Sequence, residues 1–247
     1  MSTLIAGNWK MNGLKVSLAE IKAIAEGLGD GKDGVEALIC PPATLIAAAT
    51  EVAEGSALNI GAQDCHAGAS GAHTGDISAG MIVDAGGSHV ILGHSERRTD
   101  HGELSASVNA KVLAAFDAGL TPIVCVGESL ADREAGLTEK VVLGQLDASL
   151  PREAATSAFV VAYEPIWAIG TGLTATPEQI GEVHKAIRDA LIARFEDAGE
   201  NTPILYGGSM KPANAADILA VDNVNGGLIG GASLKAYDFL AIFGEAL

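Results

Sequence analysis

The sequence predicts an α/β protein, a single parallel (β/α)8 barrel that spans residues 1–247. Eight short apolar runs occur along the chain, and each is followed by a helical pattern. The length of 247 residues suits one such barrel, and no linker or change of composition divides the chain. The main alternative is a doubly wound sheet, but no Gly-x-Gly-x-x-Gly follows the first strand. We therefore expect one barrel that forms a single domain.

The eight predicted strands are apolar runs with little polar alternation, which is typical of strands buried on both faces. They cover residues 4–8, 36–40, 58–63, 88–93, 121–127, 160–164, 204–206 and 227–229. The second run stops at Pro41-Pro42. The sixth ends in Glu164 and is followed by Pro165, which lacks a backbone donor and disfavours helix in the residue before it.

Helical segments are predicted between these strands. They cover residues 17–28, about 43–53, 77–85, a turn at 95–98, 104–118, 129–150, 178–195, a segment begun by Pro212, and a last helix that ends at Phe243. Two of them show an amphipathic face. In the first helix the face is Leu18, Ile21, Ile24, Ala25 and Leu28, and in the helix at 104–118 it is Leu104, Val108, Val112, Leu113 and Phe116. Gly119 is expected to end that helix.

Two sequence patterns predict capping boxes at helix N-termini. Ser17 is followed three residues later by Glu20, and Thr176 is followed by Gln179. Pro177 then falls at the first helical position, where its missing N–H costs nothing.

Composition limits the function. The formal net charge of −16 argues against a nucleic-acid or anionic membrane surface, both of which require basic patches. Cys40, Cys65 and Cys125 are widely spaced, which favours free thiols in a reducing compartment. Neither a signal-peptide core nor a run of membrane-spanning length is present. We expect a cytoplasmic protein with no nucleic-acid or membrane partner.

Polar residues gather where the predicted strands end, and in a parallel barrel all these ends face the same side. They are Asn8, Lys10, Gln63, His94, Glu164, Ser209 and the pair Gly230-Gly231. Together they predict a functional site at that side of the barrel.

Glu164 is the candidate general base. It ends a buried strand, and the apolar segment after it is bounded by Pro165 and by Gly170 and Gly172, as expected for a hinged lid. The alternative is an acidic residue in an ordinary strand-to-helix loop.

Two glycine loops, Gly207-Gly208-Ser209 and Gly230-Gly231, follow the seventh and eighth strands. Barrels of this kind bind phosphate there, through backbone amides and a short helix N-terminus. The alternative is that these glycines only form tight turns.

His94 precedes a helical turn that Ser95 is predicted to cap. The helix dipole disfavours an imidazolium there, so we expect a neutral ring. The other histidines are interpreted as satisfied within the barrel: His66, His73, His89, His101 and His184. None has zinc-motif spacing, so no metal is predicted.

Lys10 is a candidate cation for a developing oxyanion, and Glu96 is interpreted as an ion-pair or supporting residue rather than the base. Cys125 lies among apolar residues and is interpreted as packing.

These stretches resemble the triosephosphate isomerase family, in family order and spacing along the whole chain. The motifs are Ala6-Gly7-Asn8-Trp9-Lys10-Met11-Asn12, Gly93-His94-Ser95-Glu96-Arg97-Arg98, Ala162-Tyr163-Glu164-Pro165-Ile166-Trp167-Ala168-Ile169-Gly170-Thr171-Gly172, Tyr206-Gly207-Gly208-Ser209 and Gly230-Gly231-Ala232-Ser233-Leu234. The resemblance implies a TIM barrel and a cytoplasmic isomerase of glycolysis and gluconeogenesis. It would interconvert dihydroxyacetone phosphate and D-glyceraldehyde 3-phosphate through an enediol(ate), without cofactor or metal.

The resemblance also implies residue roles. Glu164 would remove the proton alpha to the carbonyl, His94 would polarise the carbonyl, and Lys10 and Asn8 would stabilise the enediolate. The substrate-binding set would be Asn8, Lys10, Ile169, Gly170, Ser209, Gly230 and Gly231. Residues 165–174 would form the closing lid.

The Gly-rich loop at 65–77 resembles the family's dimer loop, which implies a homodimer in which Thr74 supports Lys10 and His94 across the interface. Gln63, Glu96 and Cys125 would support the catalytic groups rather than contact the substrate. Two positions depart from the family pattern, Leu173 in place of lysine and Asn225 in place of aspartate.

Two other functions remain possible from the residues. A Schiff-base aldolase or a lyase could use the same phosphate loops, but it needs a lysine desolvated within the barrel. A non-catalytic phosphosugar-binding module would not need Glu164, His94 and Lys10 together.

Overall fold

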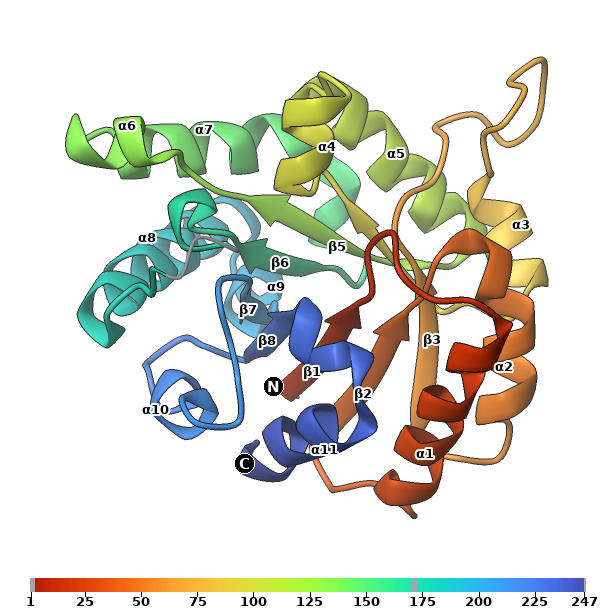
Figure 1. The fold of residues 1–247 in the computed structure, drawn as a ribbon. Coiled ribbons are helices and arrows are strands. Elements are labelled where there is room, and N and C mark those ends of the chain that lie inside the picture. The colour runs from red at the N-terminus through yellow and green to blue at the C-terminus, as the bar shows by residue number, and fades with distance from the viewer. Residues whose placement is uncertain (1–2, 170–172, 247) are drawn as a thin grey trace.

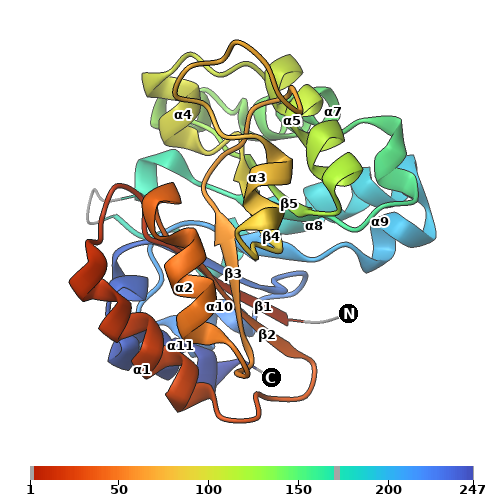
Figure 2. The same cartoon turned by 90° about the vertical axis from the view of Figure 1, so that its right-hand side faces the viewer.

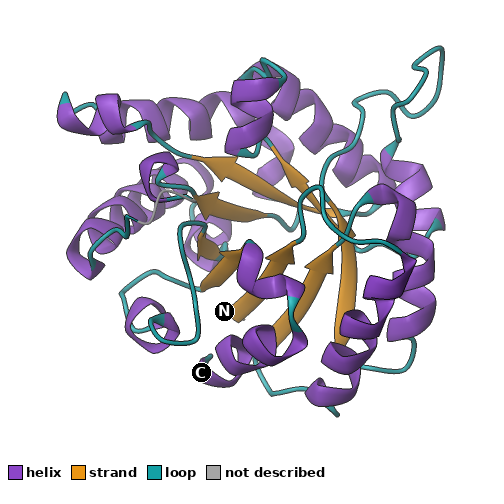
Figure 3. Cartoon of the chain, viewed as in Figure 1, coloured by secondary structure: helices purple, strands orange, loops and turns teal. Residues whose placement is uncertain are grey.

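Eight parallel strands close into a barrel in the computed structural model, which describes residues 3–169 and 173–246. The strands pair in chain order, and β8 pairs with β1 to complete the ring, as Figures 1 and 3 show. Their bounds are β1 Thr3–Asn8, β2 Val35–Cys40, β3 Leu58–Ala62, β4 His89–Leu92, β5 Thr121–Val126, β6 Val160–Tyr163, β7 Ile204–Tyr206 and β8 Gly226–Ile229. The predicted (β/α)8 barrel is confirmed.

Helices surround the strands on the outside of the ring, as the side view in Figure 2 also shows. The α-helices are α1 Leu18–Leu28, α2 Ile46–Ala53, α3 Ala79–Asp84, α4 Ser95–Asp100, α5 Ser105–Ala118, α6 Leu130–Glu134, α7 Thr138–Ser149, α8 Pro177–Phe195, α9 Asp197–Asn201, α10 Ala215–Leu219 and α11 Ala236–Glu245. Short 3-10 helices are η1 Lys15–Ser17, η2 Ala43–Leu45, η3 Arg152–Ala155, η4 Ile166–Ala168 and η5 Gly231–Leu234.

The apolar runs of the strands serve two separate cores. One cluster consists of strand residues alone and fills the barrel: Leu4, Ala6, Leu38, Cys40, Ile91, Ile123, Cys125, Val160, Ala162, Leu205 and Leu228. The alternate strand residues, such as Ile5 and Ile39, pack outward against the helices. Successive side chains of a strand point to opposite faces, so a strand with helices outside and a core inside must be apolar throughout.

One predicted capping box is confirmed and the other is wrong. The Thr176 hydroxyl accepts from Gln179 N, the Gln179 side chain accepts from Thr176 N, and Pro177 begins α8. Ser17 has helical backbone angles and no side-chain cap bond, because η1 precedes α1 directly. Glu20 accepts instead from Ala236 N, at the start of α11 (2.9 Å).

Three smaller expectations also differ. Leu104 is exposed at the N-cap of α5 and does not belong to its buried face. The helix expected to begin at Pro212 begins at Ala215, and α9 was not predicted. Gly119 does end α5, with a left-handed φ of 83°. Within 3–169 and 173–246, no helix has both the length and the apolarity needed to span a membrane.

Candidate active site

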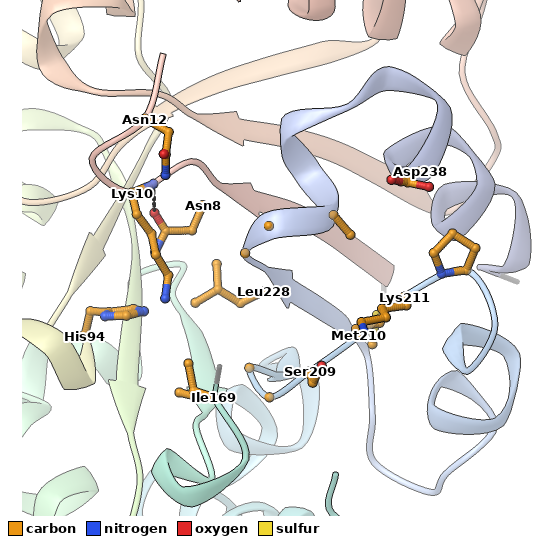
Figure 4. A pocket seen from close by; sticks show the side chains of 16 residues that line it. Asn8, Lys10, Asn12, His94, Ile169, Ser209, Met210, Lys211, Leu228 and Asp238 are labelled. Carbon is orange, nitrogen blue, oxygen red and sulfur yellow. Dashed lines mark hydrogen bonds between the residues drawn. The ribbon is translucent and has the colours of Figure 1, made fainter. Parts of the chain in front are cut away.

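A cavity of about 570 Å³ lies at the carboxyl ends of the strands. Seven of the predicted site residues line it: Asn8, Lys10, His94, Ile169, Ser209, Gly230 and Gly231. Figure 4 shows Asn8, Lys10 and His94 on one side of the cavity, and Lys211 and Asp238 on the other. Glu164 is not among the lining residues, and Gly170 lies outside the described part of the chain.

Lys10 is held in an unusual backbone conformation. Its φ is 54°, in the left-handed region that non-glycine residues rarely adopt. The Asn8 side chain accepts from Lys10 N (3.0 Å), and the Gln63 amide donates to Lys10 O (2.9 Å) and to Cys40 O (2.9 Å). The ammonium pairs with Glu96 Oε1 at 2.5 Å. Asn8 and Gln63 therefore fix the turn that aims Lys10 into the cavity.

His94 is the N-cap of α4, so the ring itself caps the helix rather than Ser95 as predicted. Nδ1 accepts from Glu96 N at 3.2 Å, which leaves the ring proton of the neutral form on Nε2. Nε2 lies 2.8 Å from Glu164 Oε1 and donates to it. Burial lowers the pKa of His94, but the Glu164 and Glu96 carboxylates together raise it by more, and the net direction is upward.

Glu164 is almost fully buried, 1% exposed, directly after β6. One carboxylate oxygen accepts from Ser95 N (2.9 Å), at the start of α4, and the other accepts from Ser95 Oγ (3.2 Å). Burial raises the pKa of Glu164, while His94 and Ser95 lower it by more, so the net direction is downward. In this arrangement the carboxylate is anchored on α4 and does not face the cavity.

The two predicted phosphate loops form one wall of the cavity. A Cβ on Gly208 would lie 2.2 Å from the Tyr206 hydroxyl, and one on Gly207 would lie 2.9 Å from Glu164 Cγ. These positions therefore accept no side chain. Beyond β8, η5 begins at Gly231, and the Ser233 hydroxyl donates to Gly230 O (2.7 Å). The N-terminus of η5, whose first amides have no acceptor within the helix, thus borders the cavity.

Glu128 is a buried carboxylate that the sequence reading missed. It accepts from the Tyr163 hydroxyl (3.1 Å) and from Trp167 Nε1 (2.9 Å), and it pairs with Arg133 (3.3 Å). These bonds tie η4, the first turn of the predicted lid, to the loop after β5. Its place at a strand end, directly after Gly127, is the signal that could have revealed it.

The remaining histidines differ from one another. His89 and His184 are buried, and burial lowers the pKa of each to about 4. His66 is partly buried and accepts from Gly68 N. His73 and His101 are exposed, so their placement within the barrel was wrong.

The three thiols are all buried and unpaired. Burial raises the pKa of Cys65 to about 12, and the pKa values of Cys40 and Cys125 are raised as well. Cys125 packs inside the barrel, as expected, close enough to Glu164 for that carboxylate to raise its pKa further.

Comparisons with known proteins agree with one another. The family model described as triosephosphate isomerase matches residues 3–246. Triosephosphate isomerase of Afipia carboxidovorans is 63% identical over 97% of this chain and 95% of its own, and that of Hyphomonas neptunium is 60% identical over 98% and 97%. The crystal structure of triosephosphate isomerase from Bartonella henselae superposes with a TM-score of 0.90 at 47% identity, covering 98% of both chains.

Proposed function

The chain belongs to the triosephosphate isomerase family, and from that premise we propose which of its residues perform the reaction. The protein is an aldose–ketose isomerase of glycolysis that interconverts dihydroxyacetone phosphate and D-glyceraldehyde 3-phosphate through an enediol(ate). The observation that supports our assignment is the convergence of Glu164, His94 and Lys10 beside the two glycine loops.

Glu164 is proposed as the base that removes the proton alpha to the carbonyl. To reach a substrate in the cavity, its carboxylate must leave Ser95 N and Ser95 Oγ. The same movement removes the bonds that hold its pKa down, while burial, which raises the pKa, persists. The carboxylate thus becomes a stronger base when it meets the substrate.

His94 is proposed to polarise the carbonyl and to move protons between the two oxygens. When Glu164 leaves, the larger of the two carboxylate effects that raise the pKa of His94 is withdrawn. Burial and the N-terminus of α4 then favour the neutral ring, with its proton on Nε2. A neutral His94 ring that donates its Nε2 proton can return to the same protonation state in each turnover.

Lys10 and Asn8 are proposed to stabilise the negative charge on the enediolate oxygens. The protein carries a formal net charge of −16, so an anionic substrate depends on local cations. Lys10 enters the cavity as a preoriented cation because Asn8 and Gln63 fix its backbone. Glu96, its ion-pair partner, keeps the ammonium at the His94 side of the cavity.

The phosphate group is proposed to lie against the amides near Ile169, Ser209, Gly230 and Gly231, which line the cavity together. The predicted contribution of Gly170 falls outside the described residues. The predicted lid, residues 165–174, includes residues 170–172, which lie outside the described part of the chain. Its closure is proposed to exclude water from the intermediate. The Glu128–Trp167 bond (2.9 Å) holds the first turn of this segment. The proposed steps are proton transfers, and they call for no cofactor or metal.

We further propose a homodimer through the loop at 65–77. Met11, Leu14 and Val16 are large apolar side chains with more than 70% of their surface exposed (97%, 73% and 80%). Met11 also borders a groove of about 440 Å³ beside that loop. A second copy that inserts the loop would cover these side chains and bring its Thr74 toward Lys10 and His94.

We also propose the domain organisation, the location and the metabolic role of the protein. Residues 1–247 are proposed to act as one catalytic domain in the cytoplasm, serving gluconeogenesis in the reverse direction.

The proposed dimer contact is tested at the tip of the loop at 65–77. Replacing Thr74 and Gly75 with bulky charged residues should give monomers of low activity. Unchanged dimer mass on light scattering would contradict the proposed loop contact.

The role of Lys10 is tested by binding a phosphate-bearing carboxylate analogue of the enediolate. Lys10→Met should weaken binding at least tenfold, because the analogue loses its cation. Lys22→Met is the matched control, since it changes the net charge equally at an exposed site on α1. Equal weakening in both variants would mean that the overall field, and not Lys10, attracts the ligand.

A further inference from the structure

The side chain of Arg98, in α4, contacts four elements around that helix. Its Nε donates to Gly93 O, directly after β4 (2.7 Å), and one terminal nitrogen donates to Cys125 O in β5 (3.1 Å). The terminal nitrogens also donate to Ser105 Oγ at the start of α5 (3.0 Å) and to Ser149 Oγ at the end of α7 (3.2 Å). One guanidinium group therefore ties α4 to two strands and two helices.

All four of these acceptors are neutral, since two are backbone carbonyls and two are serine hydroxyls. The contacts therefore depend on the directions of the donors rather than on pairing with a carboxylate. A planar guanidinium offers such fixed directions, whereas a lysine ammonium carries the same charge without them. Ser149 is fully buried, so its contact with Arg98 is shielded from water. The contacts of Arg98 thus fix the orientation of α4.

Gly93 has the conformation and the space that this contact requires. Its φ of 69° lies in the left-handed region, and a Cβ there would lie 2.8 Å from Val108 Cγ2 and 2.9 Å from a terminal nitrogen of Arg98. The Gly93 carbonyl belongs to the peptide that joins Gly93 to His94. Within α4, Arg98 N also donates to His94 O (3.0 Å). Arg98 therefore binds the backbone on both sides of His94.

We propose that Arg98 is a positioning residue for His94 and for the N-terminus of α4. This helix has six residues, and a helix of that length depends on contacts with the rest of the fold to hold its orientation. Its start presents His94 Nε2 and the Ser95 groups that bind Glu164. Arg98 does not line the cavity, so it acts through these residues. The inference rests on the proposed function, in which His94 meets the substrate carbonyl.

The effect of losing Arg98 should be confined to the carbonyl end of the substrate. Arg98→Met removes all four bonds and leaves the peptide before His94 free to shift. A displacement of about 1 Å at a catalytic group lowers the rate by up to about 100-fold, so we expect kcat to fall roughly tenfold or more. The phosphate is proposed to lie against the loops after β7 and β8, which Arg98 does not contact, so KM should change by less than about threefold.

The test measures the binding of two ligands to the full-length wild type and to Arg98→Met. Phosphoglycolate carries a carboxylate where the enediolate forms, so it meets the His94 side of the cavity. Glycerol 3-phosphate carries the same phosphate but has neither a carbonyl nor a carboxylate. Arg98→Met should weaken phosphoglycolate binding roughly tenfold or more and glycerol 3-phosphate binding by less than about threefold. Equal weakening of both ligands would overturn the proposal.

Arg188→Met is the matched control. Arg188 lies in α8 and donates to Gly199 O and to Asn225 Oδ1, directly before β8, so these bonds lie away from α4. Urea unfolding should show a loss of stability in both variants, but the ratio of the two affinities should change only in Arg98→Met. A changed ratio in Arg188→Met would show that general destabilisation causes the effect, and the proposal would then be wrong.

Arg98→Lys separates the geometry of the contacts from the charge. The lysine keeps the positive charge but cannot direct four bonds as the guanidinium does, so kcat should stay near that of Arg98→Met. A return of Arg98→Lys to the wild-type kcat would show that the charge suffices, which contradicts a positioning role.

The double variant Ser105→Ala, Ser149→Ala keeps Arg98 and removes two of its four acceptors, so it decides the question if Arg98→Met does not fold. It should lower kcat several-fold, with the same selective loss of phosphoglycolate binding. Wild-type kcat and affinities in this double variant would refute the proposal. A failure of the proposed function is distinguishable, because the wild type would then not isomerise D-glyceraldehyde 3-phosphate at all.

Discussion

Gln63 is expected to control the position of Lys10, and Gln63→Met separates this role from simple packing. The methionine has a similar volume but no amide donor. Its introduction leaves Lys10 O and Cys40 O without the bonds that Gln63 Nε2 now makes at 2.9 Å each.

The size of the effect follows from those contacts. Two neutral hydrogen bonds at about 1 kcal/mol each predict a loss of about 2 kcal/mol in the free energy of unfolding. The left-handed φ of 54° at Lys10 costs roughly 1–2 kcal/mol, and without Gln63 the backbone gains by relaxing. A displacement of about 1 Å at the ammonium would lower kcat/KM by roughly 10- to 100-fold.

Urea unfolding and the rate of triose phosphate isomerisation measure the two effects separately. Gln145→Met is the matched control, because Gln145 also makes two bonds, to Gly127 N (2.9 Å) and Gly127 O (3.0 Å), away from Lys10. The urea midpoint of Gln145→Met should fall about as much as that of Gln63→Met, but its kcat/KM should change less. If Gln63→Met loses stability but keeps full kcat/KM, Gln63 does not position Lys10.

Three further outcomes are expected. Asn225→Asp should raise the free energy of unfolding by about 1 kcal/mol in urea, because its contact with Arg188 (3.0 Å) becomes an ion pair, and a lowered midpoint would contradict this. For His184, the folded-state pKa of about 4 lies below the usual 6.5, so its stability contribution is present above pH 6.5 and falls by about 3 kcal/mol as the pH drops to 4. His184→Gln should flatten that part of the profile of stability against pH, and an unchanged slope would refute the assignment. The three buried thiols should react with a thiol reagent only after unfolding in urea, and rapid labelling of the native protein would show that they are accessible.

Much of the fold could be predicted because its signals are local. Strands buried on both faces read as continuous apolar runs, and the cap at Thr176 depends only on Gln179, three residues away. The capping box predicted at Ser17 failed because η1 runs directly into α1, and Glu20 bonds instead to Ala236, which is distant in the chain. A pattern of two residues cannot show which partner the folded chain will offer.

The candidate site likewise has features that the sequence predicts and features that it does not. Strand ends identify Lys10, His94 and Glu164 as polar residues that share one rim of the barrel. They do not show that Glu164 rests on Ser95 N, or that a left-handed Lys10 is held by Gln63. Both features depend on contacts between different strands and loops, so they appear only in the folded structure.

The variant Glu164→Gln tests whether Glu164 transfers the proton. The measurement is isomerisation of D-glyceraldehyde 3-phosphate, coupled to NADH oxidation by glycerol-3-phosphate dehydrogenase, for wild type and variant together. The amide keeps the size of the side chain but cannot accept the proton, so we expect turnover to fall by roughly 10²- to 10⁴-fold while a phosphate-bearing inhibitor still binds. A variant that turns over within about tenfold of wild type would show that another group is the base.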